Sequence, residues 1–188
     1  GKVWIATNDG LNIFDPATGE FQTVKADPND PRRPSNNRFT AIREDRQGRI
    51  WVGFAHGALN RYEPGRQVFT RIRRDATGRA GAPSVRVYAF AEAADGGMWM
   101  GCAEGLQSYD PQKDLFTAHH LDPADPYQIA GYACKALIID RKGHLWLGTW
   151  GDGVIVVDPV SGTRRHFRHN PDDPGTLTND TVLCLAED

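Results

Sequence analysis

Hydrophobic and polar positions alternate around four tryptophans that stand in closely similar phrases. The tryptophans are Trp4, Trp51, Trp99 and Trp146, which follow one another at intervals of 47, 48 and 47 residues. In each phrase the residues on either side of the tryptophan are aliphatic or Met, and an Ala or Gly stands two residues after it. Because successive side chains of a strand point to opposite faces, each phrase predicts a short strand that is apolar on both faces.

Three further β-prone runs accompany each tryptophan phrase. The run before it starts at Phe39, Val87, Cys134 and Val182. The run after it ends in Asp-Pro or Glu-Pro, where proline has no N–H to donate to a ladder. The remaining run is the least regular, which suits an outer edge strand; it starts near Phe21, Phe69, Phe116 and Arg164. No run carries the i, i+3, i+4 apolar stripe of a helix.

These runs predict an all-β chain, namely a β-propeller built from four-stranded antiparallel blades in four repeats of about 47 residues. The repeat units lie near 1–47, 48–95, 96–142 and 143–188. The run before the tryptophan is expected to be the innermost strand A, followed by the tryptophan strand B, the Asp-Pro strand C and the outermost strand D. The Ala or Gly after each tryptophan leaves room for a bulky side chain of a neighbouring sheet, which we expect to be the next tryptophan.

Composition and charge argue against several classes of protein. The 188 residues have a formal net charge of −2, which argues against a basic nucleic-acid surface or a polybasic membrane patch. No apolar run approaches the roughly 20 residues of a spanning helix. The three cysteines lack C-x-x-C spacing, so we expect neither a disulfide framework nor a zinc site. The chain starts at Gly1 without a leader, as a mature or excised chain would.

Several phrases resemble the two-component regulator propeller repeat. They are GRIWVG at residues 48–53, DGLNIFDPATGEF at residues 9–21 and NPDDPGTLTND at residues 170–180. The resemblance covers the whole chain in four copies. The second unit departs most, because RDATG at residues 74–78 replaces the Asp-Pro loop that the other units carry, for example at 27–31 and 122–126.

The resemblance implies a periplasmic or otherwise extracytoplasmic sensor, attached to a signalling domain as in hybrid histidine kinases. Such repeats usually form seven-bladed propellers, whereas this chain begins in strand B and ends in strand A, at residues 181–188. Three arrangements follow: the last strand closes a four-bladed ring beside Trp4, two chains exchange strands, or the chain is part of a larger propeller. An open end would expose an apolar blade face and favour self-association.

The loops on one rim differ between repeats, although the frame around them stays constant. Loops that a rigid scaffold does not need for its own folding are the better candidates for binding. Aromatic, amide and guanidinium groups together suit a polyhydroxylated or anionic small ligand, for which they offer stacking and bidentate hydrogen bonds. The candidate ligand-binding residues are Asn8, Asp9, Asn36, Arg38, His56, Arg86, Glu104, Tyr132, Trp150 and Asp152.

Metal and cofactor sites are not expected. The acidic loops, such as residues 27–31, lack the ligand spacing of an EF-hand and are explained as Asp-Pro turns. His166 and His169 are three residues apart, which places them on opposite faces of a strand. Cys134 and Cys184 occupy inner-strand positions where other repeats have Val, Phe or Ala, so we expect them to act as small apolar residues.

The leading functional hypothesis is a non-catalytic sensor module that recognises a small ligand. An oligosaccharide or other glycan fragment follows from the resemblance alone. The alternative is a structural or protein-interaction propeller that assembles through blade faces or strand exchange. An enzyme ranks third, because it would need paired carboxylates or a His-plus-acid constellation among Asp9, His56, Glu104 and Asp152, each of which belongs to a different repeat.

Overall fold

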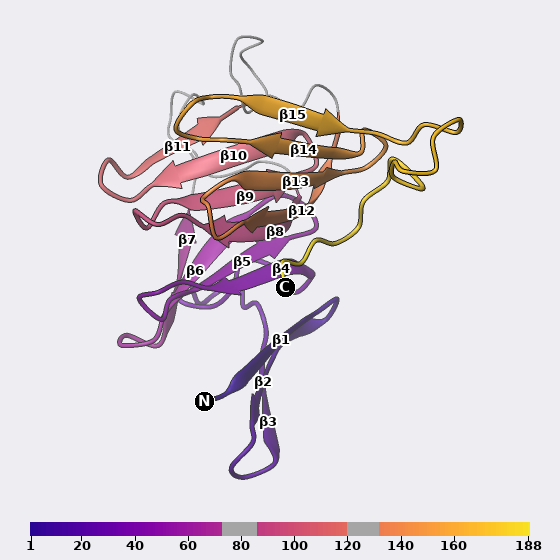
Figure 1. Ribbon diagram of the computed structural model, residues 1–188. Coiled ribbons are helices and arrows are strands. Elements are labelled where there is room, and N and C mark those ends of the chain that lie inside the picture. The colour runs from indigo at the N-terminus through magenta and orange to yellow at the C-terminus, as the bar shows by residue number, and fades with distance from the viewer. Residues whose placement is uncertain (73–85, 120–131) are drawn as a thin grey trace. The chain divides into compact units, whose positions relative to one another are not determined.

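A computed structural model describes residues 1–72, 86–119 and 132–188, and these residues form fifteen strands (Figure 1). The loop at 74–78, which differs from the Asp-Pro loops of the other repeats, and the acidic loop at 122–126 lie outside the described residues. The chain divides into two compact units, Gly1–Val87 and Tyr88–Asp188. Within the described ranges no helix is long and apolar enough to cross a membrane.

The strands form four antiparallel sheets. The first sheet contains β1 (Val3–Thr7), β2 (Gly10–Asp15) and β3 (Glu20–Val24). The second contains β4 (Phe39–Glu44), β5 (Ile50–Phe54), β6 (Leu59–Glu63) and β7 (Val68–Ile72). The third contains β8 (Val87–Glu92), β9 (Met98–Cys102), β10 (Gly105–Asp110) and β11 (Leu115–Ala118). The fourth contains β12 (Cys134–Ile139), β13 (Leu145–Thr149), β14 (Val154–Val157) and β15 (Arg164–Phe167).

The predicted order of strands A, B, C and D is confirmed in the second, third and fourth sheets. Each of these sheets is a four-stranded antiparallel blade, and the fold is an all-β propeller fold. Each sheet begins with the strand that precedes its tryptophan, so the sheets are offset from the sequence repeats by one strand. The first sheet has three strands, and among the described residues only β2 pairs with β1.

The strand predicted over residues 181–188 is wrong for most of its length. Only an isolated bridge between Trp150 and Thr181 forms there. The backbone N–H of Val182 still donates to the carbonyl of Thr149 at 2.8 Å, so the segment begins beside β13. A strand needs a neighbour to complete its ladder of hydrogen bonds, and among the described residues no ladder pairing extends beyond Thr181.

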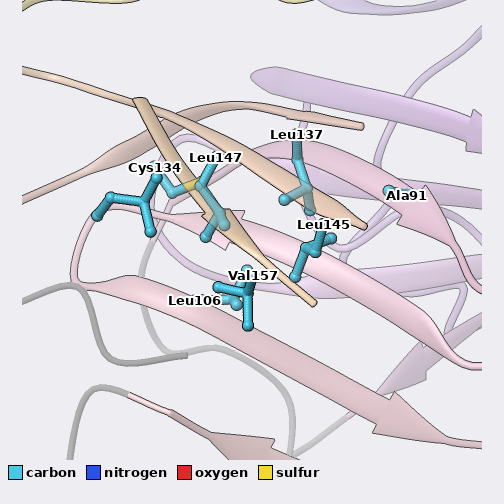
Figure 2. Packing of buried hydrophobic residues seen from close by; sticks show 8 residues of the cluster. Ala91, Leu106, Cys134, Leu137, Leu145, Leu147 and Val157 are labelled. Atoms are coloured by element: carbon cyan, nitrogen blue, oxygen red, sulfur yellow. The ribbon is translucent and has the colours of Figure 1, made fainter. Parts of the chain in front are cut away.

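Each unit has its own hydrophobic core, built from the apolar strand faces that the sequence predicts. The core of the first unit contains Leu11, Ile13, Val24, Phe39, Ile50, Val52, Phe54 and Phe69. The core of the second contains Ala91, Leu106, Cys134, Leu137, Leu145, Leu147, Ile155 and Val157 (Figure 2). Among the four repeated tryptophans Trp51 is 1% exposed, and the other three are half-buried.

The glycine after each of the last three tryptophans makes room for the inner segment of the next repeat and not for the next tryptophan. A Cβ atom on Gly53 would lie 2.7 Å from Cβ of Val87. One on Gly101 would lie 2.8 Å from the carbonyl oxygen of Cys134, and one on Gly148 would lie 2.8 Å from Val182. The expectation that the next indole fills this space is therefore wrong, because atoms of Val87, Cys134 and Val182 lie there.

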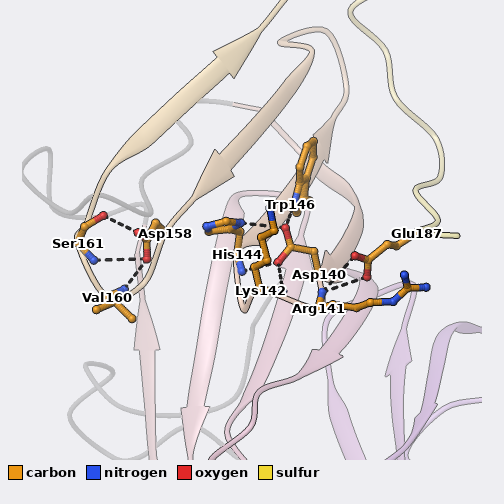
Figure 3. Close-up of polar contacts among 9 residues, drawn as sticks. All are labelled: Asp140, Arg141, Lys142, His144, Trp146, Asp158, Val160, Ser161 and Glu187. Atoms are coloured by element: carbon orange, nitrogen blue, oxygen red, sulfur yellow. Dashed lines mark hydrogen bonds and ion pairs between the residues drawn. The ribbon is translucent and has the colours of Figure 1, made fainter.

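Two of the tryptophans are fixed by an aspartate in the turn between strands A and B. Nε1 of Trp51 donates to Oδ2 of Asp45 at 2.8 Å, and Nε1 of Trp146 donates to Oδ2 of Asp140 at 2.9 Å (Figure 3). Burial acts to raise the pKa of both carboxyl groups, but the hydrogen bonds from the indoles and neighbouring donors outweigh it. Both pKa values therefore lie below the ordinary range of an aspartate. The third repeat has Ala93 at this position.

Candidate functional site

A β-bulge in the fourth sheet directs one lysine out of the regular ladder. The pairing of β12 with β13 changes register between Cys134 and Ala136, which leaves Lys135 as the extra residue. Bulges redirect a side chain and are common beside functional sites. Nζ of Lys135 lies 3.4 Å from the centre of the Tyr88 ring and 4.8 Å from the Trp150 ring. The ammonium group is therefore in cation–π contact with two aromatic faces.

The loop between β13 and β14 holds Trp150 with a fixed backbone and an exposed ring. The N–H of Trp150 donates to the carbonyl of Ala133 at 3.0 Å. Oγ1 of Thr149 donates to the Gly153 carbonyl and accepts the N–H of Asp152, both at 2.9 Å. Trp150 is nevertheless 55% exposed. A rigid loop that presents an open indole face is suited to stacking against a ligand.

Tyr132 lies beside the same loop. A Cβ atom on Gly151 would meet Cε1 of Tyr132 at 3.7 Å, so the tyrosine ring packs along this glycine. Gly151 has a φ of +97°, a conformation that side chains with a Cβ rarely adopt. Tyr132 therefore borders the loop that carries Trp150, and Lys135 contacts the rings of Trp150 and Tyr88; Tyr132 and Trp150 were both predicted from the sequence. We call these four residues the aromatic patch.

Asp152 lies in the same loop but is occupied by internal contacts. It is only 5% exposed. Its carboxylate forms an ion pair with Arg168 and lies 3.5 Å from Nε2 of His166. Burial, with the nearby charge of Arg164, lowers the pKa of His166 despite an opposing effect of Asp180. Asp152 therefore anchors the loop to the end of β15, and its carboxylate is not offered to a ligand.

In the first unit, three predicted residues converge on the loop after β5. Nη1 of Arg38 lies 3.3 Å from Nε2 of His56. Nε of Arg86 donates to the carbonyl of Ala55 at 3.1 Å. The N–H of Ala55 in turn donates to the carbonyl of Arg38 at 3.0 Å. This basic loop cluster has the bidentate donors that a carboxylate or sulfate accepts.

The remaining predicted residues are separate from these two groups. Asp9 is paired with Lys25 at 2.7 Å between oxygen and nitrogen, and its neighbour Asn8 is exposed. Oδ1 of Asn36 accepts the backbone N–H of Arg38 at 2.8 Å, so this amide shapes the loop before β4. Glu104 is exposed in the turn between β9 and β10.

Two cavities of the first unit do not coincide with the predicted rim. One of about 580 Å³ is lined by residues that include Lys2, Trp4 and Arg49. Another of about 380 Å³ shares Lys2 and Trp4 with it. None of the ten predicted ligand-binding residues lines either cavity. The ring of Trp150 is 55% exposed, so this part of the aromatic patch is an open surface that can stack against a flat ligand.

The described residues contain no group of three or more His, Cys, Asp or Glu side chains that could hold a metal ion. Burial raises the pKa of the Cys134 thiol to about 12 and raises that of Cys102 as well. Both thiols therefore stay protonated at neutral pH and are poor nucleophiles.

Comparison with known protein families identifies one segment of the chain. A family model described as the two component regulator propeller matches residues 33–56, which include strand A and strand B of the second sheet. Residues 33–56 therefore match the two-component regulator propeller repeat. The resemblance seen in its phrases is thereby confirmed. No match was found among curated proteins.

Solved structures with the same fold extend well beyond this chain. The extracellular domain of the one-component system protein BT4673 from B. thetaiotaomicron has a TM-score of 0.79 at 22% identity, over 100% of this propeller chain and 23% of its own. The extracellular domain of the hybrid two-component system protein BT3049 from the same organism has a TM-score of 0.76 at 20% identity. This match covers 90% of the propeller chain and 23% of the BT3049 chain. PorZ, a surface component of the type-IX secretion system of Porphyromonas gingivalis, has a TM-score of 0.70 at 15% identity. This match covers 100% of the propeller chain and 28% of the PorZ chain. The propeller chain therefore spans about a quarter of the length of these proteins.

Two residues of the aromatic patch were missed by sequence reasoning. Tyr88 lies in an apolar run of the sequence, and this context predicts a core residue. Lys135 carried a usable signal, because it is the single charged residue of the otherwise apolar segment 134–139 before Asp140. A lone charge in an inner strand must point to water or to a partner, and such a residue is worth adding to a list of candidates.

Proposed function

We propose that the chain is a non-catalytic, ligand-sensing module of a bacterial two-component signalling protein and that it binds a small ligand at the aromatic patch. The observation that carries this proposal is the exposed ring of Trp150 on a fixed loop, next to Lys135 and Tyr132. Stacking on an indole face together with a nearby cationic donor suits a saccharide, and the glycan class follows from the family resemblance.

The comparisons support the cellular part of this proposal. BT4673 and BT3049 are represented by extracellular domains of signalling systems. The proposed module is likewise extracytoplasmic and attached to a signalling domain in its full-length protein. Catalysis is not proposed: Asp9 is paired with Lys25 and Asp152 with Arg168, so these two carboxylates are already engaged. Neither is poised as the acid or base of a reaction.

Replacing Trp150 by alanine is expected to abolish stabilisation by the ligand and to leave the fold intact. The exposed ring contributes little to the core, whereas loss of a stacking platform costs roughly 1–3 kcal/mol of binding. Thermal-shift measurements with a panel of neutral oligosaccharides and uronates would show an increase in melting temperature for the wild type that the variant lacks. Val160→Ala is the control, because Val160 is 95% exposed and lies in the same unit as Trp150. No stabilisation of the wild type by any member of the panel would contradict the proposal.

A second candidate function is assembly with another copy of the chain. One face of the first sheet exposes Val3, Ile5 and Phe21, at 49%, 39% and 63%, and such a contiguous apolar face favours association. We expect the mass in solution, measured by light scattering, to rise with concentration, and Ile5→Glu to suppress this rise. A constant monomer mass across the concentration range would contradict assembly.

A further inference from the structure

The aromatic patch already contains a cation. Nζ of Lys135 lies 3.4 Å from the centre of the Tyr88 ring and 4.8 Å from that of Trp150. Across residues 86–119 and 132–188, no carboxylate forms an ion pair with Lys135. Its ammonium group is therefore stabilised by the negative faces of two rings, and it can still form an ion pair with an anionic group of a ligand.

The bulge at Lys135 fixes this arrangement. Cys134 and Ala136 are both buried and both pair with β13, so the backbone on either side of the lysine is held by the sheet. Cys134 also packs against Gly101 of the neighbouring sheet, where a Cβ atom would lie 2.9 Å from its Sγ. The position of the ammonium group is thus set by the fold rather than by a mobile surface chain.

We propose that Lys135 is a specificity-determining residue that makes the aromatic patch select anionic ligands over neutral and cationic ones. This inference rests on the proposed function for the existence of a ligand. Two aromatic faces around one site would otherwise attract an ammonium ligand. Because Lys135 fills that position, a second cation is repelled. A neutral ligand gains stacking on Trp150 and at most a hydrogen bond from the ammonium group to a neutral oxygen, whereas a carboxylate or sulfate gains a full ion pair with it.

The first test compares two probes of equal size, a galacturonic acid oligomer and the corresponding neutral galactose oligomer, by isothermal titration calorimetry. The wild type is expected to bind the acidic oligomer about tenfold more tightly, since a charge-assisted hydrogen bond contributes about that much. Lys135→Met should bind both oligomers equally, and Lys135→Arg should keep the preference. Lys142→Ala removes an exposed lysine of the same unit and should change nothing.

The second test needs no saccharide. Lys135→Ala empties the position between Tyr88 and Trp150 and is expected to bind tetramethylammonium, detected by chemical shift changes of the Trp150 indole, whereas the wild type does not. Thermal melting of each variant checks that the unit remains folded, and Lys135→Arg provides the folded variant that still excludes the cation.

The two tests separate the two claims. If no oligomer binds the wild type, the proposed saccharide function fails, and the tetramethylammonium measurement still decides the role of Lys135. An unchanged preference in Lys135→Met, or no gain of tetramethylammonium binding in Lys135→Ala, would overturn the inference.

Discussion

Replacing Gly101 by alanine is expected to lower the free energy of unfolding by about 3 kcal/mol, at the upper end of what overpacking a core costs. The added Cβ would lie 2.8 Å from the carbonyl oxygen of Cys134 and 2.9 Å from its Sγ. The carbonyl belongs to the backbone of β12, which is paired with β13, so it cannot yield without shifting that strand. Urea denaturation followed by tryptophan fluorescence would measure the loss.

The control for this substitution is Gly65→Ala. Gly65 has nothing within 4 Å of the position of a Cβ atom and no positive φ, so alanine there should be neutral or slightly stabilising. If Gly101→Ala were as stable as Gly65→Ala, the small residue after the tryptophan would not be needed for the approach of the inner strand, and the packing described for β9 and β12 would be incorrect.

Replacing Asp45 by alanine is expected to destabilise the first unit by a similar amount, about 3 kcal/mol. Asp45 accepts from the buried indole of Trp51, from Nε of Arg49 at 2.6 Å and from backbone N–H groups in its turn. Its loss leaves a buried indole donor and a half-buried guanidinium without their acceptor, which costs the desolvation of those groups. Thermal unfolding of the variant would measure this loss of stability.

The pH dependence of stability provides a check on the same residue. Because the pKa of Asp45 is lowered in the folded state, its contribution is present above the ordinary pKa near 4 and is lost as the pH falls through the folded value. The difference between wild type and Asp45→Ala should therefore shrink below about pH 4. Asp95→Ala is the control, since the exposed Asp95 carboxylate accepts from the Gly97 N–H and from no other group among the described residues. A difference that stays constant down to pH 2 would contradict the ion pair.

The strand pattern could be predicted because it depends on local geometry. Alternation on either side of each tryptophan follows from the two-residue period of a strand, and the Asp-Pro ends follow from the missing proline N–H. The aspartate that holds Trp51 was not predicted, although a repeated Asp six residues before Trp51 and Trp146 was visible in the sequence. The replacement by Ala93 in the third repeat concealed it.

The candidate site was predictable only in part. Trp150 and Tyr132 were found because they differ from their counterparts in the other repeats, and Arg38, His56 and Arg86 do converge on one loop. Asp152 looked equally promising, but the structure buries it against Arg168. Whether a loop carboxylate faces water or a neighbouring strand depends on the path of β15, which no local pattern specifies.

The sequence by itself determined the repeat, the all-β blades and the strands that bury tryptophan, since these follow from side-chain alternation and turn residues within each unit. Only the tertiary structure decided that the next inner segment lies against Gly53, Gly101 and Gly148 and that a bulge places Lys135 between Tyr88 and Trp150. The physical reason is that register and bulges depend on pairing between segments far apart in the chain, and a one-residue shift there changes which face a side chain takes.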